Sequence, residues 1–425
     1  MKLIYDISVL GLASYNLRNR TGIARVIEHV ALGLKRSGNC DMNFCAYHQL
    51  QDHLLCRRYL QTMPELKSVP LIEPPSAKIN RYARVADRLY PAPSDRKSTR
   101  IIRKILGVLL NNVGAGHDMI NIPALASADV FHATFYEIPS VTRTFSRLRK
   151  FVTIYDLIPV LFPQYFNQKG EHLLNRVLKS IAQDDWVITI SESTKNDLCD
   201  YLKFDPARVF VAHLAASDLF HPCTNPDELA SARKNYRIPD GPYVLSLCTL
   251  EPRKNIDFTI RCFSRLVEEE NIADLNLVLV GTKGWDFDTI FKELSHNKKL
   301  RERIIVTGFV ADEDLAAIYS NASMFVYPSF YEGFGLPPLE AMQCGVPVIT
   351  SNTSSLPEVV GGAGLMVDPR DGDALCQAML DVYRRPLLRE ELSRKSIERA
   401  RAFSWDACTE ATVRAYQTAL GGPQT

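Results

Sequence analysis

Short apolar segments alternate with longer amphipathic segments along the whole chain. The apolar segments are rich in valine and isoleucine and almost continuously hydrophobic, which is typical of parallel strands buried on both faces. The strands that they predict are Lys2–Leu10, Asp129–Ala133, Lys150–Asp156, Trp186–Ile190, Arg208–His213, Tyr243–Cys248, Leu275–Gly281, Arg303–Gly308, Met324–Pro328 and Val346–Thr350. The amphipathic segments predict helices, for example Gly22–Ser37, in which apolar residues recur with a helical period. This alternation indicates an α/β fold with ligand sites at the carboxyl ends of the strands.

One segment interrupts the alternation. Residues 215–241 contain three prolines and no strand pattern, and they separate two sets of strand–helix units of similar size. We therefore expect two doubly wound domains that face each other across a cleft, residues 1–218 and residues 219–400. A helical pattern around Trp405–Leu420 predicts that residues 401–425 form a C-terminal helix that packs back on the first domain.

Composition excludes several classes of protein. Of 425 residues, 46% are hydrophobic and 23% are charged, so the chain can bury a large core and is not disordered. The 50 basic and 48 acidic residues nearly balance, which does not favour nucleic-acid binding. The chain has neither an apolar run long enough for a transmembrane helix nor the pattern of a signal peptide at its start. Its ten cysteines form no Cys-x-x-Cys pair, so we expect free thiols and a cytoplasmic location.

A local basic segment is hidden by this balanced total. Nine lysines and arginines lie between Lys78 and Lys104, opposed only by Asp87 and Asp95, and apolar residues are interleaved with them. One interpretation is a solvated helical face. The other is a contact with an anionic partner, either a lipid headgroup or a diphosphate-bearing acceptor. The second interpretation predicts a peripheral location on the inner face of the cell membrane.

Residues 327–351 combine features of a ligand site. A predicted strand ends in a loop with Glu332 and two glycines, and a helix is predicted from about Leu336, with Glu340 one turn inside it. Glycines let the backbone approach a ligand closely, and a helix N-terminus presents free N–H groups to an anion. Glu332 could accept hydrogen bonds from sugar hydroxyls, and Glu340 from ribose hydroxyls. The alternative is a plain turn followed by a surface acid.

The two glutamates and the seven residues between them resemble the Glu-x7-Glu signature of retaining glycosyltransferases of family 4. The resemblance is strong from about Phe151 to Asp373 and weak between Gln49 and Asn121. The segments that carry it are TGIARV from Thr21, TLEPRKN from Thr249, VTGFVADEDLAAIYSNASMFVYPS from Val306 and SNTSSLPEVVGGAGLMVDPRDGDAL from Ser351. TIYDLIPVLFPQYF, from Thr153, resembles the mannosyltransferase-like branch, which often builds surface polysaccharides.

This resemblance implies a GT-B fold of two Rossmann-like domains, with the acceptor on residues 1–218 and the nucleotide sugar on residues 219–400. It implies a retaining hexosyltransferase that needs no metal or other cofactor. The favoured donor is GDP-mannose. The expected acceptor is a hydroxyl of a glycan or of a lipid-linked oligosaccharide, in polysaccharide or lipopolysaccharide biosynthesis.

The resemblance also implies roles for individual residues. Arg253 and Lys254 would hold the diphosphate, where fixed cations stabilise the charge of the leaving group. Asp156 is the best candidate to orient or deprotonate the acceptor hydroxyl, with a structural cap of the following loop as the alternative. The further residues assigned to substrate binding are Gly22, His132, Thr134, Val310, Gly333, Phe334, Gly335, Leu336 and Glu340. The chain departs from the family at Thr134 and Tyr155, where relatives often have histidine, and at Cys248, where glycine is usual.

Three Asp-x-Asp pairs resemble a metal motif of another glycosyltransferase architecture: Asp286 and Asp288, Asp312 and Asp314, and Asp371 and Asp373. Each lies at a predicted helix start, where acids interact favourably with the helix dipole, so we predict no metal site. Two other functions stay open. One is a sugar-nucleotide epimerase on the same scaffold, and the other is an inactive scaffold that binds nucleotide sugars.

Overall fold

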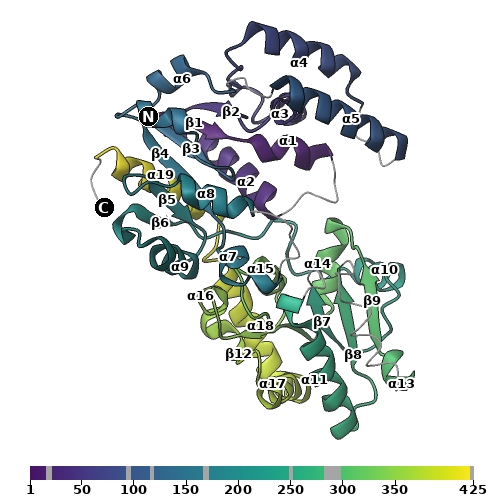
Figure 1. Ribbon diagram of the computed structural model, residues 1–425. Coiled ribbons are helices and arrows are strands. Elements are labelled where there is room, and N and C mark those ends of the chain that lie inside the picture. The colour runs from purple at the N-terminus through teal and green to yellow at the C-terminus, as the bar shows by residue number, and fades with distance from the viewer. Residues whose placement is uncertain are drawn as a thin grey trace.

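The computed structural model describes residues 1–15, 22–91, 97–114, 119–165, 172–247, 252–281 and 298–421. Two parallel six-stranded sheets lie one after the other along the chain, each flanked by helices (Figure 1). The strand order of the first sheet is β2-β1-β3-β4-β5-β6 and that of the second is β12-β11-β10-β7-β8-β9. We call the first sheet with its helices the N-terminal half and the second the C-terminal half. This arrangement confirms the predicted α/β class.

The strands of the first sheet are β1 Lys2–Asp6, β2 Asp41–Cys45, β3 Val130–Ala133, β4 Arg149–Ile154, β5 Trp186–Thr189 and β6 Val209–Val211. Those of the second are β7 Tyr243–Leu247, β8 Asn276–Val280, β9 Ile304–Gly308, β10 Met324–Tyr327, β11 Val348–Ser351 and β12 Leu365–Val367. All ten predicted segments contain a strand. The two strands that the pattern missed, β2 and β12, lie at the ends of their sheets. Polar Asn43 interrupts the apolar pattern of β2, and β12 is only three residues long.

The N-terminal half contains α1 Ser8–Tyr15, α2 Gly22–Ser37, α3 Leu50–Thr62, α4 Ala77–Leu89, α5 Lys97–Gly114, α6 Ile122–Ser127, α7 Ile158–Leu161, α8 Leu173–Ser180 and α9 Glu192–Leu202. The later helices are α10 Pro226–Asn235, α11 Ile256–Glu269, α13 Lys298–Arg301, α14 Asp312–Ser320, α15 Leu336–Gln343, α16 Leu356–Val360, α17 Gly372–Arg384, α18 Pro386–Ala400 and α19 Trp405–Ala419. The prediction for the first segment was wrong beyond Asp6. Its end belongs to α1, because Asp6 Oδ1 accepts hydrogen bonds from the amide and hydroxyl of Ser8 and the chain turns there.

The last helix returns to the N-terminal half. α19 packs against α2, β5 and β6, and Figure 1 shows it in yellow beside the first sheet. Close packing with α2 requires Gly33, since a Cβ atom there would lie 1.9 Å from Thr409 Oγ1. The Tyr416 hydroxyl lies 2.6 Å from Nδ1 of His132 in the core of this half.

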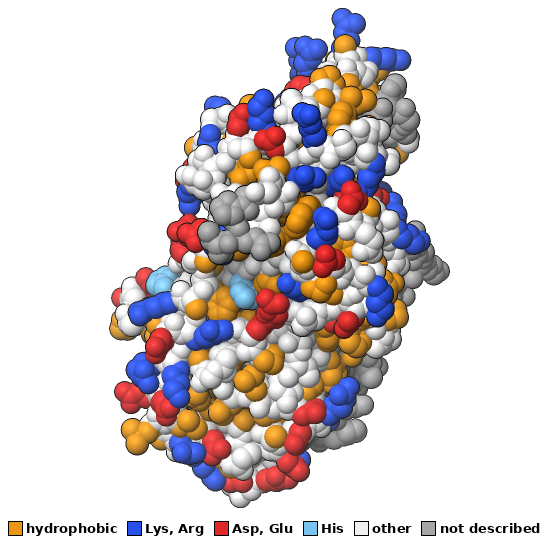
Figure 2. All heavy atoms as spheres, turned by 90° about the vertical axis from the view of Figure 1, so that its left-hand side faces the viewer, with side chains coloured by type: hydrophobic (Ala, Val, Ile, Leu, Met, Phe, Trp, Pro, Cys, Tyr) orange, Lys and Arg blue, Asp and Glu red, His pale blue; other side chains and the backbone are white. Residues whose placement is uncertain are grey.

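Charged side chains are unevenly distributed over the surface. On the face shown in Figure 2, basic and acidic side chains are interspersed over the lower part, whereas basic ones predominate at the upper end, where α4 lies in Figure 1. No helix within the described residues combines the length and the apolar character needed to cross a membrane. All nine cysteines in the described part of the chain are free thiols, and Cys248 lies outside it.

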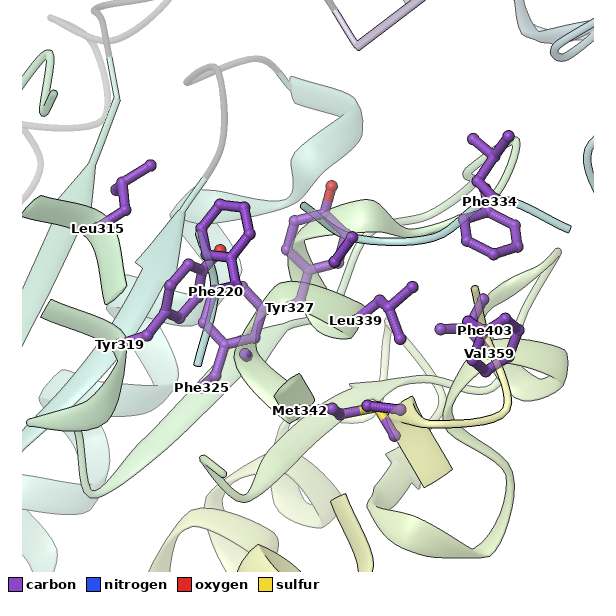
Figure 3. Close-up of a cluster of buried hydrophobic side chains, with 14 of the residues drawn as sticks. Phe220, Leu315, Tyr319, Phe325, Tyr327, Phe334, Leu339, Met342, Val359 and Phe403 are labelled. Carbon is purple, nitrogen blue, oxygen red and sulfur yellow. The ribbon is translucent and has the colours of Figure 1, made fainter. Parts of the chain in front are cut away.

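The core of the C-terminal half fixes the helix that carries Glu340. In the cluster of buried side chains drawn in Figure 3, Phe220, Tyr319, Phe325 and Tyr327 gather on one side. Leu339 and Met342, on the buried face of α15, lie beside them and are inaccessible to solvent. Burying these large side chains stabilises α15, a short helix that would not form alone in water.

The Gly33 contact predicts how much stability is lost when a methyl group is added between α2 and α19. Gly33→Ala should lower the free energy of unfolding by about 1–2 kcal/mol, because overpacking outweighs the helix propensity that alanine adds. No rotamer of Thr409 relieves the contact, since its Cβ would itself lie 3.0 Å away. Urea unfolding measures the effect. Gly362→Ala, where nothing lies within 4 Å, is the matched control. Equal stability of both variants would contradict this packing.

Candidate active site

The candidate site lies where the order of the second sheet reverses. From β7 the chain proceeds outward to β8 and β9 and then returns to form β10 on the other side of β7. The carboxyl ends of two adjacent strands that lead in opposite directions leave a crevice, which is the usual ligand site of such sheets. The loops that follow β7 and β10 carry Lys254 and Glu332.

Backbone contacts join these two loops. The Phe330 amide donates to the Arg253 carbonyl at 3.0 Å, and Asn255 Nδ2 donates to the Pro328 carbonyl at 3.1 Å. Asn255 is buried and has a left-handed backbone (φ 58°), a conformation that asparagine tolerates better than most residues. The end of the TLEPRKN segment is thus held in one conformation against the loop of Glu332.

Glu332 is the centre of a dense polar cluster. Its Oε1 accepts hydrogen bonds from Lys254 Nζ at 2.7 Å, Ser329 Oγ at 2.7 Å and the Tyr327 hydroxyl at 2.9 Å. Arg253 Nη1 lies 3.0 Å from the same oxygen. Burial alone would raise the pKa of Glu332, but Lys254, Arg253 and the hydrogen bonds lower it to about 2. Glu332 is therefore ionised and paired with both cations at neutral pH.

A cavity of about 470 Å³ adjoins this cluster and lies between the two halves. That volume is within the range of small-molecule sites. The N-terminal half contributes Gly22, Arg25, Val26 and His29 from α2, and α19 contributes Trp405. The residues of the C-terminal half on its wall include Lys254, Val310, Asp312, Leu315, Tyr327, Leu336 and Glu340. Of the residues assigned from sequence, Gly22, Val310, Leu336, Glu340 and Lys254 thus share one cavity.

Glu340 lies at the wall of this cavity, one turn into α15. Its Oε2 accepts a hydrogen bond from the Tyr319 hydroxyl at 3.0 Å. Burial raises the pKa of Glu340 to about 7, although the Tyr319 hydrogen bond and the charge of Arg25 lower it. Arg25 in turn forms an ion pair with Asp312, so α2 and α14 are joined across the cavity.

The start of α15 differs from the expectation. A helix N-terminus was expected to present free N–H groups to an anion, but Pro337 and Pro338 occupy its first turn and have no amide hydrogen. The prediction of a helix from Leu336 is confirmed, and Gly335 has a left-handed backbone (φ 117°) at the turn before it. This helix therefore offers side chains rather than a full set of amides to a ligand.

The loop of Glu332 also contacts the N-terminal half directly. A Cβ atom on Gly333 would lie 2.5 Å from the Tyr155 carbonyl oxygen and 2.9 Å from Asp156 Cβ. Thr194 Oγ1, at the start of α9, donates to both the Tyr155 and the Gly333 carbonyls at 3.3 Å. Glycine at position 333 is thus required by the approach of the two halves.

A second contact between the halves lies nearby. The Glu358 carboxylate accepts hydrogen bonds from the amides of Glu192 at 2.9 Å and Ser193 at 3.2 Å, at the N-terminus of α9. His213 Nε2 lies 3.2 Å from the same carboxylate. A carboxylate at a helix N-terminus is stabilised by the helix dipole, so this contact favours the observed domain arrangement.

Asp156 lies next to Gly333. Its Oδ1 accepts a hydrogen bond from the Ile158 amide at 2.9 Å, the loop cap that was the alternative interpretation. Burial raises the pKa of Asp156, while the Ile158 hydrogen bond, Arg253 and Lys254 lower it and Glu332 raises it further. Asp156 is therefore within the electrostatic reach of the Glu332 cluster, although it does not line the cavity described above.

Eight of the residues assigned from sequence are not on the wall of this cavity, and three of these, His132, Thr134 and Phe334, are enclosed in the protein core. His132 is buried in the core, with Nδ1 2.6 Å from the Tyr416 hydroxyl and Nε2 2.8 Å from Thr153 Oγ1, so neither ring nitrogen faces a substrate. Burial lowers its pKa to about 3. Thr134 is also buried, and its hydroxyl donates to the Asp6 carbonyl at 2.9 Å. Phe334 packs against Phe403 in the core. The structure thus corrects these three assignments, because the polar groups are satisfied internally or the side chain is enclosed.

The Asp-x-Asp pairs have structural partners where they are described. Asp312 pairs with Arg25, Asp314 accepts from the Tyr236 hydroxyl at 2.7 Å, and Asp371 caps α17. Asp373 pairs with Arg265 at 2.8 Å. Asp286 and Asp288 lie outside the described residues. Within the described ranges, no group of three or more potential metal ligands is found.

Comparison with known proteins shows the family of the chain. A family model described as glycosyl transferases group 1 matches residues 230–402. The O-antigen chain mannosyltransferase B of Escherichia coli is 35% identical over 270 residues, which are 63% of this chain and 70% of that protein. The chain belongs to the group 1 glycosyltransferases. The serotype-specific mannosyltransferase WbdA of Escherichia coli is 30% identical over 274 residues, and the chain spans 33% of its length.

Solved structures support the fold of this glycosyltransferase. Sucrose-phosphate synthase of Thermosynechococcus elongatus has a TM-score of 0.63 and 19% identity over 99% of this chain and 98% of that one. WaaG, a glycosyltransferase involved in lipopolysaccharide biosynthesis, has a TM-score of 0.59 and 14% identity over 99% and 100%. At such identities the likeness concerns the fold alone, and it confirms the predicted GT-B architecture.

Several residues of the glycosyltransferase site were missed by the sequence analysis. Arg25 and Asp312 are 287 residues apart, and no local pattern links them. Tyr327 was placed on its strand, but its contact with Glu332 depends on the loop folding back. For Asn255, the residue before α11, the available signal is its type alone, because asparagine tolerates the left-handed conformation found there.

The close contact at Gly333 predicts how the halves respond to one added methyl group. Gly333→Ala should push the loop of Glu332 away from Tyr155 and Asp156, because backbone atoms cannot give way by that amount. Small-angle scattering should then give a larger radius of gyration. Gly22→Ala is the control, since its Cβ would lie at an ordinary 3.6 Å from Leu336. An unchanged scattering profile for Gly333→Ala would contradict the described approach.

Proposed function

We propose that this glycosyltransferase is a retaining, metal-independent hexosyltransferase that moves mannose from GDP-mannose to a hydroxyl of a glycan or lipid-linked acceptor. The observation that carries the proposal is the Lys254–Glu332–Arg253 cluster beside an interdomain cavity that also contains Glu340. The cluster places two cations beside a cavity of the size of a small ligand. A nucleotide diphosphate sugar needs cations for its diphosphate and a cavity for its sugar.

The charges of the cluster favour a diphosphate. Lys254 and Arg253 carry two positive charges and share one negative charge on Glu332, so the three side chains together are singly positive. A diphosphate arriving there would take over part of the coordination of the two cations. The carboxylate of Glu332 would then accept hydrogen bonds from hydroxyls of the donor sugar.

The same cations explain how the bond to the leaving group is broken. As the glycosidic bond lengthens, negative charge accumulates on the diphosphate, and fixed cations in a partly buried site stabilise it. In the proposed retaining reaction the acceptor attacks on the face from which the diphosphate departs, and a leaving phosphate oxygen takes the acceptor proton. Asp156, beside the Glu332 loop, would orient the acceptor hydroxyl. Closure of the two halves would exclude water.

Mannose and guanine are proposed from relatives, and the base rests on the name of a GDP-mannose-dependent mannosyltransferase of Mycolicibacterium smegmatis that is 31% identical over 222 residues. The names of O-antigen chain mannosyltransferase B and of WbdA state mannosyl transfer, and the TIYDLIP segment supports the same sugar. Those names also support a place in surface polysaccharide biosynthesis. The N-terminal half would hold the acceptor, since Tyr155 and Asp156 reach the loop of Glu332 from that side.

Removing the charged groups tests the proposal. Lys254→Ala and Glu332→Ala should each reduce transfer from GDP-mannose by about 10²–10³-fold, the usual cost of losing one electrostatic stabiliser of a transition state. The assay follows release of GDP in the presence of a mannose-terminated acceptor. Lys395→Ala, which removes half of an exposed ion pair with Glu391 on α18, is the matched control. Wild-type turnover by Lys254→Ala would refute the proposed role.

The elevated pKa of Glu340 predicts a pH dependence of donor binding. Ribose hydroxyls bind best to an ionised carboxylate, and a pKa of about 7 means that acid protonates it in the free protein. Affinity for GDP-mannose, which has no titrating phosphate in this range, should be about tenfold weaker at about pH 6 than at about pH 8. Calorimetry measures it. Glu340→Gln should bind more weakly and lose this dependence, and a dependence retained by Glu340→Gln would assign it to another group.

A further inference from the structure

α4 and α5 form a helical hairpin at the edge of the N-terminal half (Figure 1). A small hydrophobic cluster of their own attaches them to α3, and its buried members are Leu50, Leu54, Leu55, Ile79, Ala83, Tyr90 and Leu110. Arg58 on α3 adds an ion pair with Asp87, at 2.5 Å. The hairpin is therefore held from one side, and within the described ranges nothing packs against its opposite side.

The open side is unusually apolar. Of the 18 large hydrophobic side chains that are exposed in the described part of the chain, nine lie on these two helices: Tyr82, Val85, Leu89, Ile101, Ile102, Ile105, Val108, Leu109 and Val113. Leu89 is 64% exposed and Ile101 59%. Soluble monomers rarely expose such a contiguous patch unless it binds something.

The spacing shows that these residues form a continuous helical face. In α5, Ile101, Ile105 and Leu109 recur every four residues and are all more than half exposed. Leu106 and Leu110 lie on the other face and pack toward α3. α5 is thus apolar on both sides, although only one side has a hydrophobic partner among the residues that the structure describes.

Basic side chains flank the apolar face. Arg81, Arg84 and Arg88 recur along one side of α4 and are exposed, and Arg100 and Lys104 are exposed on α5. Asp87 is the sole acid in these two helices, and it is already paired with Arg58. The surface therefore combines exposed hydrocarbon with a local excess of positive charge, as Figure 2 shows at the upper end of the molecule.

We propose that the exposed face of α4 and α5 binds the surface of an anionic membrane, with its isoleucine, valine and leucine side chains among the acyl chains and its arginines at the headgroups. Apolar residues bordered by basic ones match the interface of such a bilayer. A second copy of this face would place like charges against each other, which opposes self-association. A small phosphate ligand would leave the hydrocarbon uncovered.

The hairpin is close to the carboxyl edge of the first sheet. Asn111 of α5 donates from Nδ2 to Gln49 Oε1 at 2.7 Å, and its Oδ1 lies 3.4 Å from the Gln51 amide. These two glutamines lie at the start of α3, soon after the carboxyl end of β2. Asp156 follows the carboxyl end of β4, at the same edge of the sheet. Membrane binding would therefore bring the acceptor side of the cleft near the lipid surface, a consequence that rests on the proposed function. The binding itself does not depend on it.

Vesicle sedimentation of the full chain tests the inference without donor or acceptor. The protein should pellet with vesicles of phosphatidylglycerol and phosphatidylcholine at low salt and not with phosphatidylcholine alone. Replacing Arg84 or Arg88 by alanine should weaken the partition coefficient about fivefold per residue. Absence of pelleting with phosphatidylglycerol vesicles at low salt would overturn the proposal.

A second pair of variants separates insertion from mere electrostatic attraction. Ile105→Asp with Leu109→Asp should abolish binding, whereas Leu387→Asp, at an 81% exposed leucine on α18, should leave it unchanged. Circular dichroism and thermal melting check that each variant is folded. Binding retained by the double variant would overturn insertion. Gel filtration that shows dimers of the wild type, lost in the double variant and without lipid binding, would assign the face to a second copy instead.

Discussion

The sharing of one carboxylate by two cations holds the candidate site together. Glu332 is buried, and a buried charge is costly unless it is paired and hydrogen-bonded. Lys254 and Arg253 supply the pairing, and Tyr327 and Ser329 complete the hydrogen bonds. Because the two cations follow β7 and the carboxylate follows β10, the cluster also ties together the two loops at the point where the strand order reverses.

The same loop connects the site to the rest of the molecule. Gly333, directly after Glu332, touches the backbone at Tyr155, and Thr194 bridges the two halves at this point. A shift of either half would thus move the cluster relative to the cavity. Pairing within the cluster, close backbone packing and the ion pair of Arg25 with Asp312 define one interdomain site rather than two independent surfaces.

The sequence alone was sufficient to predict those parts of the site that depend on the local pattern of apolar and polar residues. Buried strands are nearly continuous apolar runs, so the ends of β7 and β10 and the charged residues after them could be located. Edge strand β2 alternates polar and apolar residues and was missed. His132 was assigned to the substrate from the family resemblance, but Tyr416 of α19, 284 residues later, covers it. Such burial depends on tertiary packing, which spacing along the chain does not encode.

In the proposed function, Lys254 and Arg253 exchange part of their contact with Glu332 for a diphosphate. A crystal structure of the chain with GDP tests it most directly. Phosphate oxygens should lie within hydrogen-bond distance of Lys254 and Arg253, and the ribose hydroxyls should contact Glu340, in the cavity between the halves. GDP bound elsewhere, with the Lys254–Glu332 pair undisturbed and the cavity empty, would contradict it.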